Sequence, residues 1–301
     1  MVDLDNALNR FRQIFDQSKI LDSPDLKNVL VVLDETKDRE EFIFHLIKQF
    51  HERWGSKVNF TFLLAVRGYL DQAKEAKIKL ETLPALIEKV KREFQGEDEL
   101  FNVVFFTDEE KSPFYRIEEI LNQRKIDFII IPVPFTLFAK EEKQSNTSLG
   151  TTIDNVIIRC LMDNLIPVFL VRHTQEIPFD NIKILIRESM FRKDLFGWLF
   201  ALITQDAKVT LYHSELSEKE IERIKTYMEI IEEKLKIYTE DFKIEFVEGQ
   251  FALIDFCNLM SKEADTLIVF QAMKKIENDA QRITLSLYNQ ASNVLIFPPL
   301  E

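Results

Sequence analysis

Short apolar runs and amphipathic stretches alternate along most of this chain of 301 residues. The run Val29-Leu30-Val31-Val32-Leu33 is continuous and rich in β-branched residues, which is typical of a strand buried on both faces of a sheet. The helix expected after it carries Ile43, Ile47, Phe50 and Trp54 on one side. Strands that alternate with helices in this way predict βαβ crossovers and a parallel sheet.

The alternation continues as far as residue 171, and a polar segment, 172–178, then forms the expected linker. After it the same order of elements begins again, with shorter connections, as expected for a duplication followed by loop trimming. Further strands of the first copy are expected at 58–66, 101–106, 128–131 and 168–171, and helices at 72–94, 113–123 and 152–162. The corresponding positions of the two copies are Val29 and Ile184, Val58 and Val209, Asp127 and Asp265, and Val168 and Val294.

The sequence therefore predicts an α/β fold with two tandem, doubly wound parallel sheets of five strands each, preceded by an N-terminal helix. The expected boundaries are 1–24 for the helix, 25–173 for the first domain and 174–301 for the second. Leu4, Leu8, Phe11 and Phe15 form an apolar stripe on the N-terminal helix, which either packs against its own domain or contacts a partner.

Composition and charge limit the classes of partner. A formal charge of -12 argues against non-specific binding to nucleic acid or to an anionic membrane. No apolar stretch approaches the roughly 20 residues that a membrane span needs. Cys160 and Cys257 lie among apolar residues at helical spacing, so both are expected in the core of a reduced, cytoplasmic protein. The four histidines show no ligand spacing, so no metal site is expected.

Several short motifs resemble the universal stress protein family. They are the first strand with its acidic end, Val29 to Asp34; the segment Leu149-Gly150-Thr151-Thr152; the closing strand from Ile166 to Arg172; and Glu248-Gly249-Gln250 with the strand that follows. Two copies of the family's module would cover the chain from Lys27 to its end. The resemblance implies a stress-response protein that acts as a binding and signalling module rather than as a turnover enzyme.

The resemblance also implies an ATP site in the first copy, at the carboxyl ends of its strands. Asp34 matches the acidic residue after strand one, and Val66 matches the strand-two position that touches the base. Gly150, Thr151 and Thr152 match the helix start that donates N–H groups to phosphate. Each has an ordinary structural role as an alternative: a helix cap for Asp34, core packing for Val66, and a plain capped helix start for the last three. No metal is expected beyond the Mg²⁺ that accompanies a nucleotide.

The sequence departs from the family at the phosphate loop. Pro132-Val133-Pro134-Phe135 stands where the family has Gly-x2-Gly, and proline has no N–H to donate. In the second copy, Phe270-Gln271-Ala272 contains no glycine either, so that copy is expected to bind no nucleotide. Two alternatives therefore stay open: a pair of structural or interaction domains without nucleotide, and a weak ATP-hydrolysing enzyme. The closing strands, Val168–Val171 and Val294–Ile296, are expected to pair within the chain and give a pseudo-dimer, with further homo-oligomers as an option.

Overall fold

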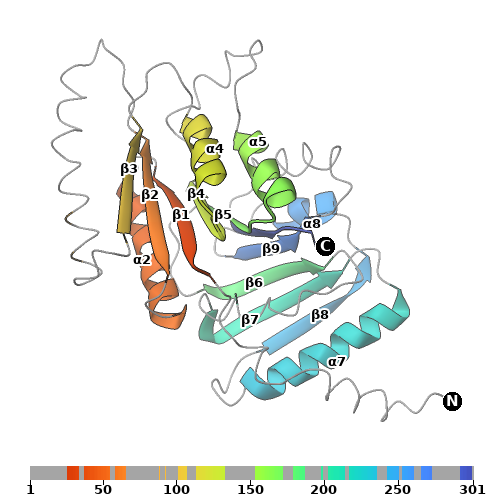
Figure 1. Ribbon diagram of the computed structural model, residues 1–301. Coiled ribbons are helices and arrows are strands. Elements are labelled where there is room, and N and C mark those ends of the chain that lie inside the picture. The colour runs from red at the N-terminus through yellow and green to blue at the C-terminus, as the bar shows by residue number, and fades with distance from the viewer. Residues whose placement is uncertain are drawn as a thin grey trace.

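In the part of the chain that the structure describes, the protein has an α/β fold with one mostly parallel sheet of ten strands (Figure 1). The alternating pattern of buried strands and amphipathic helices in the sequence accounts for this architecture. The computed structural model describes residues 26–33, 37–54, 58–65, 88, 92, 101–106, 113–132, 153–171, 179–186, 198, 203–213, 217–235, 243–250, 253–260, 266–272 and 292–299. The predicted N-terminal helix at 1–24 lies outside these residues.

The first half of the described chain, residues 26–171, holds five strands in the order β3-β2-β1-β4-β5. Its strands are parallel to one another, and β1 lies between β2 and β4. The elements are β1 (Asn28–Leu33), α2 (Lys37–Trp54), β2 (Asn59–Ala65), β3 (Phe101–Phe106), α4 (Pro113–Gln123), β4 (Phe128–Pro132), α5 (Ile153–Ile158), the π-helical turn η4 (Arg159–Asp163) and β5 (Val168–Val171).

The second half, residues 179–299, holds the other five strands in the order β10-β9-β6-β7-β8. Its strands are also parallel to one another, and β6 lies between β7 and β9. The order of the first half is thus repeated in reverse across the sheet. The elements are β6 (Phe179–Ile186), β7 (Ile203–His213), α7 (Glu218–Leu235), β8 (Lys243–Gln250), α8 (Leu253–Met260), β9 (Leu267–Gln271) and β10 (Asn293–Phe297).

An antiparallel pair, β5 with β10, joins the two halves. Val168 lies opposite Ile296, and Leu170 lies opposite Val294, so the predicted pairing of the closing strands is confirmed. Through this pairing the two predicted sets of five strands form one continuous sheet of ten strands. In the view of Figure 1 the strands change direction strongly from β1 to β8, as the accumulated right-handed twist of a long sheet requires.

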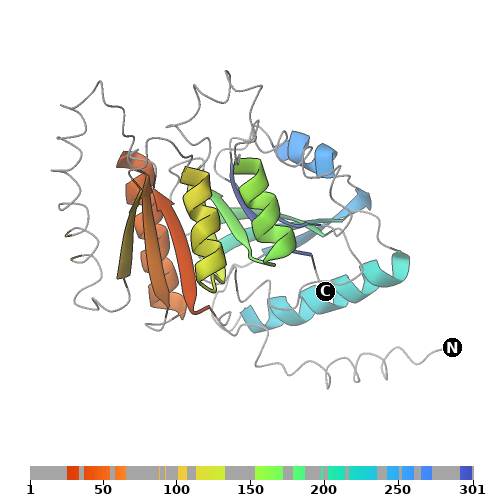
Figure 2. The same ribbon diagram turned by 45° about the horizontal axis from the view of Figure 1, so that its top comes forward.

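Two buried clusters cover the two faces of the sheet. Residues of α2 and α7 pack on one face, and residues of α4, α5 and α8 pack on the other. Figure 2 shows α2 on one side of the first half and α4 with α5 on the opposite side. The predicted stripe of α2 is confirmed where it is described, since Ile43, Ile47 and Phe50 are all buried. Among the described residues, no helix has the length and apolar content that crossing a membrane would need.

The cluster on the α2 face crosses the boundary between the halves. Trp198 packs edge-on against Phe128 of β4 and Phe297 of β10, with ring centroids 5.1 Å and 5.5 Å apart. Phe42 of α2 packs against Phe179 of β6 at 6.5 Å. Buried aromatic pairs of this geometry stabilise a core beyond the area that they bury. The halves therefore share one core on this face in addition to one sheet.

Candidate functional site

The strand order marks one position in the first half where a ligand could bind. In doubly wound sheets, ligands bind beyond the carboxyl ends of the strands, at the point where the strand order reverses. Here the reversal falls between β1 and β4, which pair from Val29 with Phe128 to Val31 with Ile130. The last residues of these two strands are Leu33 and Pro132.

The five residues predicted to bind nucleotide all lie outside the described part of the chain. They are Asp34, Val66, Gly150, Thr151 and Thr152. Their sequence neighbours are described: Leu33 ends β1, Ala65 ends β2, and Ile153 begins α5. The structure therefore neither brings the five residues together nor separates them, and their roles stay predictions.

Pro132 occupies the place where the resemblance leads one to expect a glycine. It is the last residue of β4, it is buried, and it pairs with Val171 of β5. The described pairs of β4 with β1 end two residues earlier, at Ile130, so Pro132 lies beyond the part of β4 that pairs with β1. Because proline has no N–H, the main chain at this position donates nothing to a phosphate.

At the carboxyl ends of its strands, the second half carries two buried polar side chains, His213 and Gln271. Strand β6 ends at Ile186, β7 ends at His213, and β9 ends at Gln271. Ile186 pairs with His213, and Leu185 pairs with Phe270, so Gln271 follows at the same level on the other side of β6. Paired residues of parallel strands face the same side of a sheet, so His213 and Gln271 share a face.

These two polar residues have apolar counterparts in the first half. The pairing of β4 with β1 begins at Phe128, and the pairing of β9 with β6 begins at Leu267. Both β4 and β9 are five residues long. Gln271 therefore corresponds to Pro132, and His213 corresponds to Leu64. Sequence reasoning missed both residues. The signal that could have found them is a polar residue at the end of a buried strand, as in Tyr212-His213 and Phe270-Gln271.

Burial controls the chemistry of this polar pair. His213 is 3% exposed and Gln271 is 9% exposed. Burial, and next the positive charge of Lys225 on α7, lower the pKa of His213, because both disfavour the imidazolium. The Nε2 atom of Gln271 is buried and has no hydrogen-bond partner in the structure. A buried donor without an acceptor is costly, so this amide needs an explanation.

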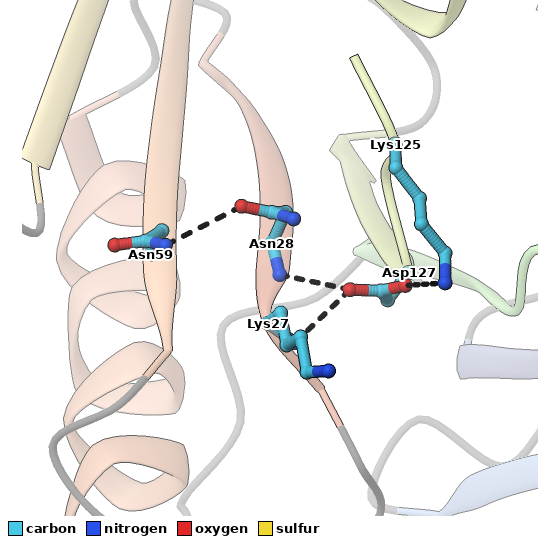
Figure 3. A network of polar contacts seen from close by, with 5 residues as sticks. All are labelled: Lys27, Asn28, Asn59, Lys125 and Asp127. Carbon is cyan, nitrogen blue, oxygen red and sulfur yellow. Dashed lines mark hydrogen bonds and ion pairs between the residues drawn. The ribbon is translucent and has the colours of Figure 1, made fainter.

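A third polar group lies at the opposite, amino edge of the first half (Figure 3). The Asp127 carboxylate accepts hydrogen bonds from the main-chain N–H groups of Lys27 and Asn28, each at 3.0 Å. The Asn28 side-chain oxygen accepts a hydrogen bond from the Asn59 amide at 3.4 Å. Lys125 lies 4.0 Å from the carboxylate with a largely exposed side chain.

The Asp127 group connects the beginnings of three strands. Main-chain bonds run beside it, from Asp127 N–H to the Asn28 carbonyl at 2.9 Å and from Asn59 N–H to the Lys27 carbonyl at 2.7 Å. In the second half, the Asn181 amide donates to the Thr266 hydroxyl at 3.2 Å. Because Asp127 lies at the amino edge, it is far from the carboxyl edge where a ligand would bind. Its role is to hold the starts of β1 and β4 together.

Neither a metal cluster nor a reactive thiol is found in the described part of the chain. No group of three or more His, Cys, Asp or Glu side chains gathers there in a way that could hold a metal ion. Cys160 is fully buried in the core, as predicted, and burial raises the pKa of its thiol to about 12. The side chain of Cys257 is not among those that the structure describes.

Comparison with solved structures relates this arrangement to known proteins. A universal stress protein from Archaeoglobus fulgidus DSM 4304 matches 91% of this chain and 99% of its own, with a TM-score of 0.53 and 13% identity. The fold resembles that of a universal stress protein. At this identity the likeness concerns the fold alone.

Two further solved structures cover the same share of the chain with lower scores. The cytoplasmic domain of a prokaryotic cation chloride cotransporter matches over 96% of its length, with a TM-score of 0.49 and 12% identity. A protein assigned to the universal stress family from Pseudomonas aeruginosa UCBPP-PA14 matches over 94%, with a TM-score of 0.46 and 15% identity. No known protein family matches the sequence. No curated protein matches it either.

Proposed function

We propose that the chain is a stress-response binding and signalling module of the universal stress type, made of two tandem domains, 25–173 and 174–301. The repeated strand order on either side of the β5–β10 pair supports this proposal, together with the likeness in fold to a universal stress protein. The two domains would form an intrachain pseudo-dimer, in which β10 takes the position that the β5 of a second copy would take.

The first domain is the proposed nucleotide site. ATP would lie beyond the carboxyl ends of β1 and β4, where the strand order reverses. Asp34 and Val66 would contact the adenosine part, and Gly150, Thr151 and Thr152 would face the phosphates at the start of α5. Mg²⁺ would enter only with the nucleotide.

Pro132 favours a second candidate function, an interaction module without nucleotide. It is a buried strand residue at the place where a phosphate loop needs N–H donors. The core shared between the halves also suits a protein that presents one rigid surface, because Trp198 contacts both β4 and β10. In this second case the chain would act through a protein partner alone.

One experiment separates the two candidates. The purified chain is denatured, and the released small molecules are separated by chromatography; the melting temperature of the native protein is then measured with and without ATP and Mg²⁺. Bound adenine nucleotide, or a rise in melting temperature with ATP, supports the first candidate, because a ligand that binds only the folded state stabilises it. Absence of both would overturn it and leave the module without nucleotide.

Two variants test whether the rise in melting temperature with ATP arises at the proposed site in the first domain. Asp34→Ala is expected to abolish the rise in melting temperature, while Asp163→Ala, an exposed acid of the same half, should retain it. A rise that survives Asp34→Ala would contradict the proposed contact. Turnover of added ATP well above background would instead favour an enzyme.

A further inference from the structure

We propose that the second half completes the nucleotide site proposed for the first half, with Phe179 of β6 as a positioning residue that holds the start of α2. Phe179 would not touch the ligand, because it acts through Phe42 of α2. This inference rests on the proposed function of the first domain. It gives the second half, which is expected to bind no nucleotide, a role in that site.

The start of α2 is buried on more than one side. Phe42, Ile43 and Phe44 are consecutive, and each is at most 4% exposed. Successive residues of an α-helix are turned by about 100°, so these three side chains spread over roughly 200° of the helix surface. A helix that only lies on a sheet buries a narrower stripe. Something besides the sheet beneath it must therefore cover the start of α2.

Two aromatic contacts, one from each half, supply this cover. Phe44 packs against Phe62 of β2, in the first half, with ring centroids 6.1 Å apart. Phe42, on the other side of the helix, packs edge-on against Phe179 of the second half at 6.5 Å. His45 is exposed, so the side of α2 between these two contacts faces the solvent. The start of α2 thus lies between a wall of its own half and a wall of the second half.

The sheet places Phe179 at the edge where the strands of the first half end. β10 runs antiparallel to β5, with Val294 opposite Leu170, so the starts of β10, β9 and β6 lie at the edge where β4 and β5 end. Phe179 is the first residue of β6. Because α2 follows β1, it begins at this edge as well. The contact between Phe42 and Phe179 therefore lies at the edge of the sheet where the nucleotide site is proposed.

The start of α2 links this contact to a proposed ligand residue. β1 ends at Leu33 and α2 begins at Lys37, so the connection between them consists of residues 34–36. Asp34 belongs to this short connection, and the position of the helix start therefore limits where its carboxylate can lie. Binding sites need their contacting groups held to within about 0.5 Å, so even a small shift of the helix weakens binding.

Hydrogen exchange of the free, full chain tests whether Phe179 holds α2. The measured quantity is the protection of amides 41–44 of α2 divided by that of amides 129–131 of β4, so that an equal loss of global stability cancels. Phe179→Ala should lower this ratio by about fivefold, the effect of one lost aromatic pair, and Phe179→Leu should retain most of it.

Phe256→Ala is the matched control for this exchange experiment. It removes a ring that is also fully buried in the second half, but this ring packs against Tyr212 on the other face of the sheet. The ratio should therefore keep its wild-type value in this variant. An equal ratio in Phe179→Ala and Phe256→Ala would overturn the proposal.

Titration calorimetry with ATP and Mg²⁺ tests the consequence for the site. Where the wild type binds ATP, Phe179→Ala should bind it about fivefold more weakly, while Phe256→Ala should bind like the wild type. Unchanged affinity in Phe179→Ala would overturn the positioning role and leave the nucleotide site standing. Absence of ATP binding by the wild type would overturn the nucleotide site, and the exchange ratio alone would then decide whether the second half holds α2.

Discussion

Phe169 of β5 lies opposite Leu295 of β10, at the centre of the antiparallel pair that joins the two halves. By the strand pairing, these two residues hold the same position in their respective halves, since Ile129 pairs with Val168 and Ile268 pairs with Val294. Each half thus contributes the same position to the contact, as in the isologous interface of a symmetric dimer. Both side chains are fully buried in the cluster that contains residues of both halves.

The central position of this pair predicts a large effect of truncation on stability. Phe169→Ala and Leu295→Ala should each lower the free energy of unfolding by roughly 3 kcal/mol, the usual cost of a cavity in a core. The double variant should lose less than the sum, because the two side chains share one packing site. Urea unfolding followed by circular dichroism measures all four proteins.

The shared core further predicts that both halves unfold together in one transition. Leu259→Ala on α8 serves as the control, since Leu259 is 50% exposed and its truncation should change stability by less than about 0.5 kcal/mol. Two separate transitions, with Phe169→Ala shifting only one of them, would show that the halves are independent.

Cys160 gives a chemical test of the core on the other face of the sheet. Burial raises the pKa of its thiol to about 12, so the reactive thiolate is scarce at neutral pH and the sulfur is not accessible. In a Cys257→Ser variant, which leaves Cys160 as the only thiol, a thiol reagent should modify the native protein very slowly and the urea-unfolded protein at once. Rapid modification of the native protein would contradict the buried position.

The fold could be predicted from the sequence because its signal is local. The run from Val29 to Leu33 predicts a buried strand on its own, and the alternation of such runs with amphipathic helices predicts a parallel α/β sheet. The pairing of the closing strands could be predicted as well, because both are short apolar runs at the end of each copy. The contact of Trp198 with both halves could not, because no local pattern specifies which distant elements it meets.

The correspondence of Asp127 with Asp265 shows where the sequence misleads. It rests on matching residue type, but the strand pairing aligns Phe128 with Leu267, so Thr266 is the true counterpart of Asp127. Side chains alternate between the faces of a sheet, so a shift by one residue places a side chain on the wrong face. The sequence shows that His213 and Gln271 each end a buried strand, but their common level in the sheet depends on the register of distant strands and could not be predicted.

We expect substitution of Asp127 to lower the stability of the protein without changing the binding of any ligand. Asp127→Ala should lower the free energy of unfolding by about 2 kcal/mol, because two main-chain N–H groups lose their acceptor. Asp127→Asn keeps an acceptor oxygen and should lose less. Lys125→Ala should change stability by less than about 0.5 kcal/mol, since its ion pair is long and its side chain is 85% exposed. Equal losses for Asp127→Ala and Lys125→Ala in urea unfolding would refute this account.

From the buried imidazole of His213, we expect the folded protein to lose stability in mild acid. In the unfolded chain the pKa of His213 is near 6.5, whereas in the folded protein burial and the charge of Lys225 lower the pKa of this imidazole. As the pH falls through this interval, the unfolded chain takes up the proton first, so the free energy of unfolding falls. The stability associated with the neutral imidazole is therefore complete above about pH 6.5 and is lost as the pH falls towards the folded value.

Melting temperatures measured between about pH 7.5 and 5.5 test this linkage. The wild type should lose more stability over this range than His213→Gln, which cannot take up a proton there. His45→Gln makes the same substitution at an exposed histidine of α2 and serves as the matched control. If His213→Gln and the wild type show the same pH dependence, the buried imidazole is not what makes the fold sensitive to acid.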